Sequence, residues 1–332
     1  MMPVALSAQH TFSIVAIDSI TGEIGSAGAT CGDSIIWPGT PGAILISDVI
    51  PGIGAIHTQS YYTENNQLNA HNRMLAGDSP EEIINWLVAN DVSSNPSIRQ
   101  YGIIDFNNGS PRSAGFTGEN CFDYKNHVLG LNYAIQGNIL LGQQIIDSME
   151  SGFNNTSGCL SDKLMGAMQG ANVVGADTRC MSEGTSSLSA FLRVAKPGDD
   201  PNAIFIDLNI AGTPQGIEPL DELLIKYNNW KNNNNYDCST QGIIESLDES
   251  ETILIYPNPA GNIIYIQRNG IPLSKIEISD LTGKTILNQN ISEPKTTLEI
   301  EVGHLKNGEY FITSFAQGSL VSNNKFTISS NN

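Results

Sequence analysis

The stretch TFSIVAID, residues 11–18, determines how the larger part of the chain is interpreted. Its β-branched and apolar residues are typical of a buried strand. The turn at residues 19–22 leads into a second apolar run, residues 23–30, and the two runs together predict a β-hairpin. Thr11 places a hydroxyl at the head of the inner strand. Thr11 is therefore a candidate nucleophile, although threonine also begins many strands for structural reasons alone.

N-terminal-nucleophile chemistry uses such a residue in a specific way: its Oγ attacks a carbonyl, and its own freed α-amino group takes the proton. The first residues, MMPVALSA, end like a signal peptide but lack a basic start and a full apolar segment. We therefore interpret residues 1–10 as the remnant of a leader, with an ordinary frayed terminus as the alternative. Cleavage after Ala8 would leave Thr11 blocked, so the hypothesis requires a second cleavage between His10 and Thr11.

The composition excludes several classes of function. A chain of 332 residues is long enough for about two domains, and no apolar run reaches the roughly 18 residues that a membrane helix needs. The formal net charge of -18 repels nucleic acid and anionic lipid, so we expect neither as a partner. The charge is uneven, because residues 1–230 carry 9 basic and 23 acidic residues whereas residues 253–332 carry 6 of each. This shift predicts a domain boundary.

Residues 11–230 alternate between strand and helix patterns. Hairpin-linked strands imply largely antiparallel sheets with helices packed outside them, which is an α+β fold. The capping box Ser79-Pro80-Glu81-Glu82 opens one of the helices, with proline at the first helical position. Further strands are predicted at residues 43–47, 53–58, 100–106, 111–117, 186–194 and 203–210, and further helices at residues 64–76, 139–151, 160–171 and 219–227.

The C-terminal part of the chain follows a different pattern. Residues 231–252 are polar, acidic and rich in asparagine, and this composition predicts a linker. Residues 253–332 contain about seven short alternating segments with turn signals between them. We therefore expect a small all-β sandwich there.

Four landmarks in residues 253–332 resemble a known family. They are YPNPA at residues 256–260, ISDLTGK at residues 278–284, LKNGEY at residues 305–310, and Lys325. In this order they are similar to the type A sorting domain of the type IX secretion system of Bacteroidota. The resemblance implies an immunoglobulin-like sandwich that is the address for the type IX secretion machinery. It also implies export through the periplasm to the cell surface or the exterior. A fibronectin-like adhesion module is the alternative.

Six further segments span most of residues 11–230: TFSIVA at 11–16, GAIHTQSY at 54–61, QYGIID at 100–105, FTGENC at 116–121, AIQGNIL at 134–140 and GADTR at 175–179. Together they resemble the DUF1028 family, which is placed among proteins with the N-terminal-nucleophile (Ntn) hydrolase fold. The resemblance implies a four-layer αββα sandwich and strengthens Thr11 as the catalytic candidate. It does not define a reaction, because the activity of the family is not settled and a fold alone does not confer chemistry.

Six polar residues in these segments are the candidates for substrate binding: Thr58, Gln59, Gln136, Asn138, Asp177 and Arg179. The hydroxyl and amide groups can bind a developing oxyanion or a substrate amide, or else they satisfy polar groups in turns between layers. The Asp–Arg pair can orient the amine or hold a substrate carboxylate in a bidentate way, or else it is a structural ion pair.

No motif for a metal or a cofactor is present, and we expect neither. The chain has no H-E-x-x-H, no G-x-S-x-G and no phosphate-binding loop. The five cysteines show no C-x-x-C pair and no zinc-site spacing. In an exported protein they predict one or two disulfides and leave a free thiol, and Cys31 is more typical of a disulfide partner than of a nucleophile. We interpret His57 and the other histidines as hydrogen-bonded core or surface residues.

Two hypotheses for function follow. The first is an exported Ntn-fold amide hydrolase that acts through Thr11 on a small peptide or a cell-wall-like substrate. The second is a non-catalytic extracellular binding or surface module on the same fold. Homo-oligomerisation stays open under both hypotheses, and the sequence does not identify the substrate.

Overall fold

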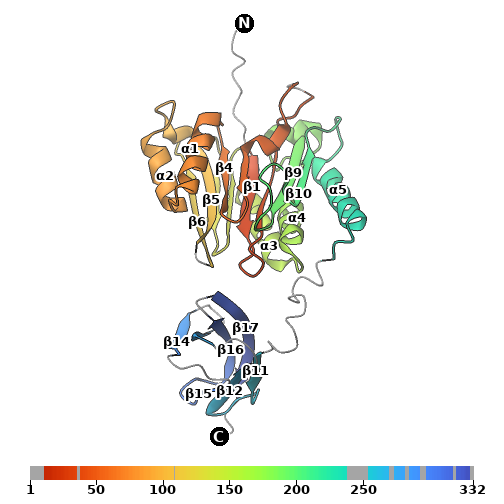
Figure 1. Ribbon diagram of the computed structural model, residues 1–332. Coiled ribbons are helices and arrows are strands. Elements are labelled where there is room, and N and C mark those ends of the chain that lie inside the picture. The colour runs from red at the N-terminus through yellow and green to blue at the C-terminus, as the bar shows by residue number, and fades with distance from the viewer. Residues whose placement is uncertain are drawn as a thin grey trace. The chain divides into compact units, whose positions relative to one another are not determined.

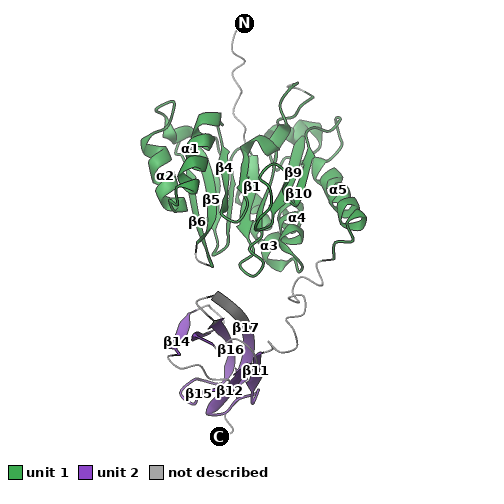
Figure 2. Ribbon diagram, in the orientation of Figure 1, with its two compact units in different colours: residues 1–242 green, residues 243–332 purple. Residues whose placement is uncertain are grey.

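The computed structural model describes residues 11–35, 38–107, 109–237, 253–268, 273–280, 284–291, 297–316 and 319–329. The chain divides into two compact units, residues 1–242 and residues 243–332 (Figure 2). The predicted leader and most of the predicted linker lie outside the described residues.

Six antiparallel strands form the first sheet of unit 1, in the order β10-β9-β2-β1-β8-β7. They are β1 (Thr11–Ile17), β2 (Ile24–Thr30), β7 (Asn126–Leu129), β8 (Tyr133–Gly137), β9 (Ser189–Ala195) and β10 (Ile206–Ile210). The predicted hairpin is confirmed, because β1 pairs with β2 along its whole length. The other edge of β1 pairs with β8, a strand that the sequence pattern does not predict. The inner strand of the hairpin is therefore flanked on both sides.

Four antiparallel strands form the second sheet, in the order β3-β4-β5-β6. They are β3 (Ser47–Ile50), β4 (Gly54–Gln59), β5 (Gln100–Asn107) and β6 (Ser110–Thr117). The strand predicted at residues 43–47 is wrong, because Gly42–Ile46 forms a 3₁₀ helix, η1. Gly42 has a φ of 78°, which starts a turn, and the apolar side chains that follow it pack against Phe191. A short apolar run is compatible with either type of element.

Helices cover the outer face of each sheet (Figure 1). α1 (Glu64–Leu75) and α2 (Pro80–Ala89) pack on the second sheet around Ile56 and Ile103. α3 (Gln143–Asn155), α4 (Leu160–Gly170) and α5 (Pro219–Asn233) pack on the first sheet around Phe12 and Ile14. The two sheets in turn pack on each other through a third apolar cluster that includes Val15. Unit 1 therefore consists of helix, sheet, sheet and helix layers.

The ends of three helices compare with the predictions as follows. The capping box of α2 is confirmed, because the side chains of Ser79 and Glu82 each accept a hydrogen bond from the other residue's backbone N–H. α3 begins at Gln143 instead of residue 139, because Ile139 has a φ of 56°, which a right-handed helix excludes. α5 continues to Asn233, beyond the predicted end and into the predicted linker. Two 3₁₀ turns, η2 (Pro96–Ile98) and η3 (Thr178–Glu183), complete the unit.

The alternation of side chains along β1 and β4 determines what lies between the sheets. In β1, Phe12 faces the helices, whereas Ser13 and Val15 face the second sheet. In β4, Ile56 faces its helices, whereas His57 faces β1. Odd-numbered residues of both strands therefore meet in the space between the two sheets.

Unit 2 is built from antiparallel strands alone. One sheet has the order β11-β12-β15 and the other has the order β14-β13-β16-β17. The strands are β11 (Ile253–Tyr256), β12 (Ile263–Arg268), β13 (Lys275–Ser279), β14 (Thr285–Asn290), β15 (Thr297–Glu301), β16 (Gly308–Ala316) and β17 (Ser319–Ile328). Both sheets contribute to one apolar core, which includes Ile264, Ile276 and Phe326. Across the described parts of both units, no helix is long and apolar enough to span a membrane.

Candidate functional site

Thr11 is the first residue of β1, and it lies close to the ends of β2, β4 and β8. It pairs with Thr30 at the end of β2, and its backbone oxygen accepts hydrogen bonds from the backbone N–H of Asn138 (3.2 Å) and from Nε2 of Gln59 (3.1 Å). Strand alternation directs the Thr11 side chain into the space between the sheets, on the same face as Ser13. The side chain is fully buried in the chain as it stands, with residues 1–10 still attached.

A buried polar network lies next to Thr11 between the two sheets. Its centre is Ser13, whose hydroxyl lies 2.6 Å from Oε1 of Gln59, 2.9 Å from Nδ1 of His57 and 2.7 Å from Nε2 of Gln136. The Nε2 group of Gln59 donates to Thr11, so its Oε1 must accept the proton of Ser13. Ser13 thereby determines which way the Gln59 amide faces.

His57 extends this network away from Thr11. Its Nε2 lies 2.6 Å from the hydroxyl of Ser26, which in turn lies 2.7 Å from the hydroxyl of Ser47. Nη1 of Arg193 donates to the backbone oxygen of Ser47 (3.1 Å). Burial, together with the nearby positive charge of Arg193, lowers the pKa of His57 to about 3. His57 is therefore a neutral hydrogen-bonding residue at physiological pH.

Gln100 joins the network to the Asn138 side of Thr11. Its Oε1 accepts from Nε2 of Gln59 (2.8 Å) and from Nδ2 of Asn138 (2.9 Å). The next residue on that face of β5 is Gly102, where a Cβ would lie 1.9 Å from Oε1 of Gln136. Only glycine leaves room for the Gln136 amide between the sheets, so the backbone of β5 is part of the site.

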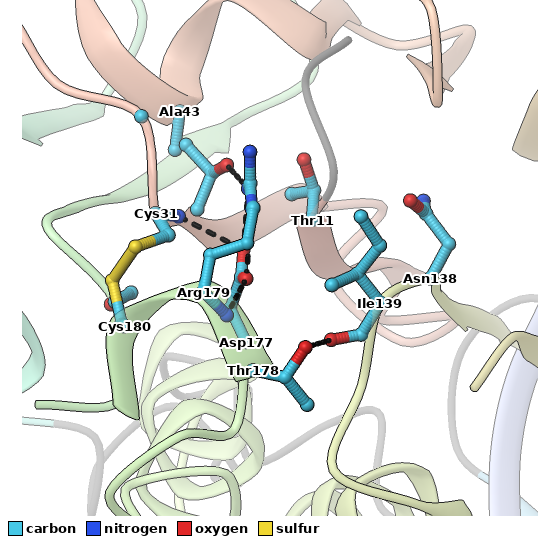
Figure 3. A network of polar contacts seen from close by, with 12 residues as sticks. Thr11, Cys31, Ala43, Asn138, Ile139, Asp177, Thr178, Arg179 and Cys180 are labelled. Carbon is cyan, nitrogen blue, oxygen red and sulfur yellow. Dashed lines mark hydrogen bonds and ion pairs between the residues drawn. A yellow bond between two sulfur atoms is a disulfide. The ribbon is translucent and has the colours of Figure 1, made fainter. Parts of the chain in front are cut away.

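An ion pair and a disulfide border Thr11 on the β2 side (Figure 3). The Arg179 guanidinium donates to the buried Asp177 carboxylate through Nε (3.0 Å) and Nη2 (2.6 Å), and through Nη2 to the hydroxyl of Thr30 (3.2 Å). Asp177 also accepts a hydrogen bond from the backbone N–H of Cys31 (3.0 Å). A disulfide joins Cys31 to Cys180, the residues that directly follow Thr30 and Arg179. The guanidinium is therefore held beside the strand that pairs with Thr11.

Two segments with unusual backbone conformations border the other side. Ser60 and Tyr61, directly after β4, have φ values of 55° and 56°, and Ile139, directly after Asn138, has a φ of 56°. Non-glycine residues adopt this region rarely and at an energetic cost, and such positions concentrate at functional sites. The backbone N–H of Ile139 donates to the backbone oxygen of Phe122 (3.1 Å), so the backbone of Phe122 lies next to this segment.

The comparisons with known proteins agree with this architecture. A family model described as DUF1028, a family of unknown function, matches residues 11–220. The chain belongs to the DUF1028 family. A crystal structure of a DUF1028 protein from Silicibacter pomeroyi is similar at a TM-score of 0.53 and 23% identity, covering 67% of this chain and 89% of that one. No curated protein matches the chain.

Residues 254–329 match the model of a secretion system C-terminal sorting domain. The DUF1028 domain is therefore an exported cargo, secreted to the cell surface or the exterior, and its sorting domain implies interaction with the type IX secretion machinery. Disulfides are expected in such a compartment. Cys31 and Cys180 form one, Cys159 is also disulfide-bonded, and Cys121 is a buried free thiol.

The predicted site residues of the DUF1028 domain fall into three groups. Gln59 and Asn138 contact Thr11 directly, and Gln136 reaches it through Ser13. Asp177 and Arg179 form the ion pair on the β2 side described above. Thr58 is the exception. It lies on the face of β4 that packs against the helices, and its hydroxyl has no hydrogen-bond partner in the described part of the chain. The proposal that Thr58 binds substrate is dropped.

Sequence reasoning missed Ser13, Thr30 and Gln100 as members of the site. It interpreted a fourth member, His57, as a hydrogen-bonded core or surface histidine, and the structure confirms a buried, hydrogen-bonded one. The signal that could have found them is the alternation itself. His57 and Gln59 share one face of β4, and Ser13 shares the Thr11 face of β1. None of the described residues forms a group of three or more His, Cys, Asp or Glu side chains that could hold a metal ion.

Proposed function

We propose that the DUF1028 domain is an Ntn-type amide hydrolase with the four-layer αββα fold, and that Thr11 is its nucleophile. Its substrate would be a small peptide or a cell-wall-like amide. The observation that carries this proposal is the position of Thr11: a hydroxyl residue at the end of an inner strand, between two sheets and bordered by amide side chains and a guanidinium.

The reaction would require Thr11 to become the first residue. Its nitrogen is in a peptide bond with His10 and its side chain is fully buried, so the chain as it stands is a precursor. After cleavage, the α-amino group takes the Oγ proton as Oγ attacks the substrate carbonyl, and returns it to the leaving amine. Water then releases the acyl group from Oγ by the same proton route.

The neighbours of Thr11 supply the remaining requirements. The backbone N–H of Asn138 and Nε2 of Gln59 both donate to the backbone oxygen of Thr11, and they are suited to hold the nucleophile in one position. The Arg179 guanidinium is suited to hold a substrate carboxylate, because its side chain is 29% exposed and its orientation is set by Asp177. In this proposal the polar network behind Thr11 positions these groups and does not react.

The same observations bear on a second candidate, a non-catalytic binding module. It is favoured by the burial of Thr11 and by the two residues, Gln9 and His10, that a signal-peptidase cut after Ala8 would leave in front of it. We further propose that residues 1–10 are a leader remnant, residues 11–230 the hydrolase domain, residues 231–252 a linker and residues 253–332 an immunoglobulin-like sandwich. The two candidates differ in what they require of the mature N-terminus.

Mass spectrometry of the secreted protein, combined with a reactive probe, distinguishes them. We expect the mature chain to begin at Thr11 and to be acylated at that residue by a β-lactone. Thr11→Ala should lower labelling by at least about 10³-fold, whereas Thr11→Ser should retain it, because serine keeps the hydroxyl. A mature chain that begins at Gln9 and resists the probe would establish the binding module instead.

A further inference from the structure

The two sides of Thr11 carry opposite chemistry. β2 flanks β1 on one side, and beside its end lie Thr30 and the guanidinium of Arg179. β8 flanks β1 on the other side, and beyond its end the backbone N–H of Ile139 donates to the backbone oxygen of Phe122. We call Arg179 with Asp177 the charged wall, and Tyr61 with Phe122 the aromatic wall. A molecule that spans Thr11 from β2 to β8 would extend from the first to the second.

The charged wall is built to stay in place. Asp177 is fully buried and accepts hydrogen bonds from the backbone N–H groups of Cys31 and Arg179 as well as from the guanidinium. The backbone donors compensate part of the carboxylate charge, so the guanidinium, whose side chain is 29% exposed, keeps part of its positive field. The Cys31–Cys180 disulfide fixes the loop that carries it.

The aromatic wall is also held from behind. The ring centroids of Tyr61 and Phe122 lie 6.1 Å apart at an interplanar angle of 35°, and Phe122 is 49% exposed. Tyr61 has a left-handed backbone, and Nη1 of Arg99 donates to its backbone oxygen. Arg99 is itself fixed by a buried ion pair with Asp91, with Nε to Oδ2 at 2.7 Å. A buried charge pair thus maintains a costly backbone conformation at a surface ring.

We propose that these two walls select an amide that carries a carboxylate on one side of the scissile bond and an aromatic ring on the other. Arg179 would bind the carboxylate, and the Tyr61–Phe122 pair would pack against the ring in an offset or tilted arrangement. The proposal deepens the function proposed above and rests on it for the chemistry. Recognition itself does not require turnover, so it can be tested by binding alone.

The test uses the chain that begins at residue 11, prepared with Thr11→Ala so that no ligand is consumed. Calorimetry compares N-phenylacetylglycine with N-acetylglycine, which lacks the ring, and with N-phenylacetylglycinamide, which lacks the carboxylate. We expect each omission to weaken binding at least about tenfold, since one ring contact and one charge-assisted pair are lost in turn. N-succinylaniline, with the two groups exchanged across the amide, tests the opposite orientation.

Variants assign each preference to its wall. Phe122→Ala should abolish the preference for the ring only, and Arg179→Gln the preference for the carboxylate only. Leu131→Ala is the matched apolar control, because Leu131 is 88% exposed in the turn at the far end of β8. Arg112→Gln is the matched charge control, because Arg112 also pairs with an aspartate, Asp105, at the far end of β5.

The outcomes separate the two proposals. Preferences that are lost in Phe122→Ala and Arg179→Gln, in either amide orientation, support the two walls. If the protein with Thr11 intact hydrolyses neither N-phenylacetylglycine nor N-succinylaniline, that result counts against the hydrolase alone. Binding of all four ligands with equal affinity, or preferences that survive both Phe122→Ala and Arg179→Gln, overturns the two walls. Binding of none of them does the same.

Discussion

The space between the two sheets has two halves that are built from the same strands and differ in chemistry. Toward the Asp18 end of β1 it is filled by apolar side chains, including Val15, Ile17 and Ile104. Toward the Thr11 end it is filled by polar side chains: Ser13, His57, Gln59, Gln100 and Gln136, all of them buried. The change occurs within β1, between Ser13 and Val15.

The difference indicates that the polar half contributes less to the free energy of folding than the apolar half. Burial of apolar area contributes directly to folding, whereas a buried hydrogen bond returns only about 1 kcal/mol over the bond to water that it replaces. The polar half even leaves Oε1 of Gln136 without a hydrogen-bond partner in the described part of the chain. Since this half adjoins Thr11, we interpret it as the support that orients the site, obtained at the expense of packing.

The largest expected effect concerns the Cys31–Cys180 disulfide, which joins the end of β2 to η3 beside the polar half. The double variant Cys31→Ser/Cys180→Ser should lower the free energy of unfolding by about 2–5 kcal/mol, because the bridge closes a loop of 149 residues. It should also loosen Arg179 and so weaken the preference for ligands with a carboxylate. Urea unfolding and the calorimetric comparison measure the two effects.

Cys121→Ser is the matched control for the loss of a sulfur atom, because Cys121 is buried and unbridged and its loss opens no loop. If the double variant lost stability but kept the full carboxylate preference, the disulfide would be a structural bridge that does not position Arg179. The polar half would then hold its ion pair without covalent help.

Two substitutions within β1, one in each half, compare the polar half with the apolar half directly. Ser13→Ala should cost about 1–3 kcal/mol, because it leaves Gln59 and Gln136 with unmatched polar groups. Val15→Ala should cost about 2 kcal/mol through lost apolar burial and a small cavity. The two losses in stability are similar, but only Ser13→Ala should lower acylation of Thr11 by the β-lactone, since only Ser13 sets the direction of the Gln59 amide.

Chemical denaturation and the rate of probe labelling measure these effects in the same two proteins. Equal labelling rates for Ser13→Ala and Val15→Ala would mean that the polar half does not support the site. Thr58→Val is a further control, because its hydroxyl is buried on the opposite face of β4 and should affect neither quantity strongly.

The apolar half and the hairpin could be predicted from the sequence because they follow local rules. Residues 11–30 show β-branched runs around a glycine turn, and such a pattern specifies strand type and pairing together. The C-terminal strands were predictable for the same reason, since their alternation is regular. The boundaries of α3 and η1 were not, because they depend on positive φ values at Ile139 and Gly42 that no periodicity reveals.

The polar half could be predicted only in part. Gln59, Gln136 and Asn138 were found because they lie in segments that resemble the family, but their partners Ser13 and Gln100 were not. A serine inside an apolar strand carries no local sign that two sheets will bring it against His57 from a distant strand. Thr58 was assigned to the site for the opposite reason: its neighbours belong there, and strand alternation excludes it.

The smallest expected net effect comes from two pH dependences of opposite sign, one from each half, that largely cancel. His57, in the polar half, has its pKa lowered to about 3, so between pH 6.5 and 3 the unfolded chain binds a proton that the folded chain does not. Its contribution to stability is complete above pH 6.5 and is lost as the pH falls. Glu23, before β2 at the Asp18 end, has its pKa raised to about 7 by burial, against the attraction of Lys196 and with repulsion from Asp18 and Asp199.

For Glu23 the folded chain binds the extra proton between pH 4.5 and 7, so its contribution is complete below pH 4.5 and is lost as the pH rises. Each group changes stability by up to about 1.4 kcal/mol per pH unit in its window, and between pH 4.5 and 6.5 the two changes oppose each other. Urea unfolding across this window should therefore give a nearly flat profile from this pair. His57→Gln should tilt the profile so that stability falls with rising pH, and Glu23→Gln should tilt it the other way. Parallel profiles for the two variants would show that neither half holds its titratable group in the protonation state assigned here.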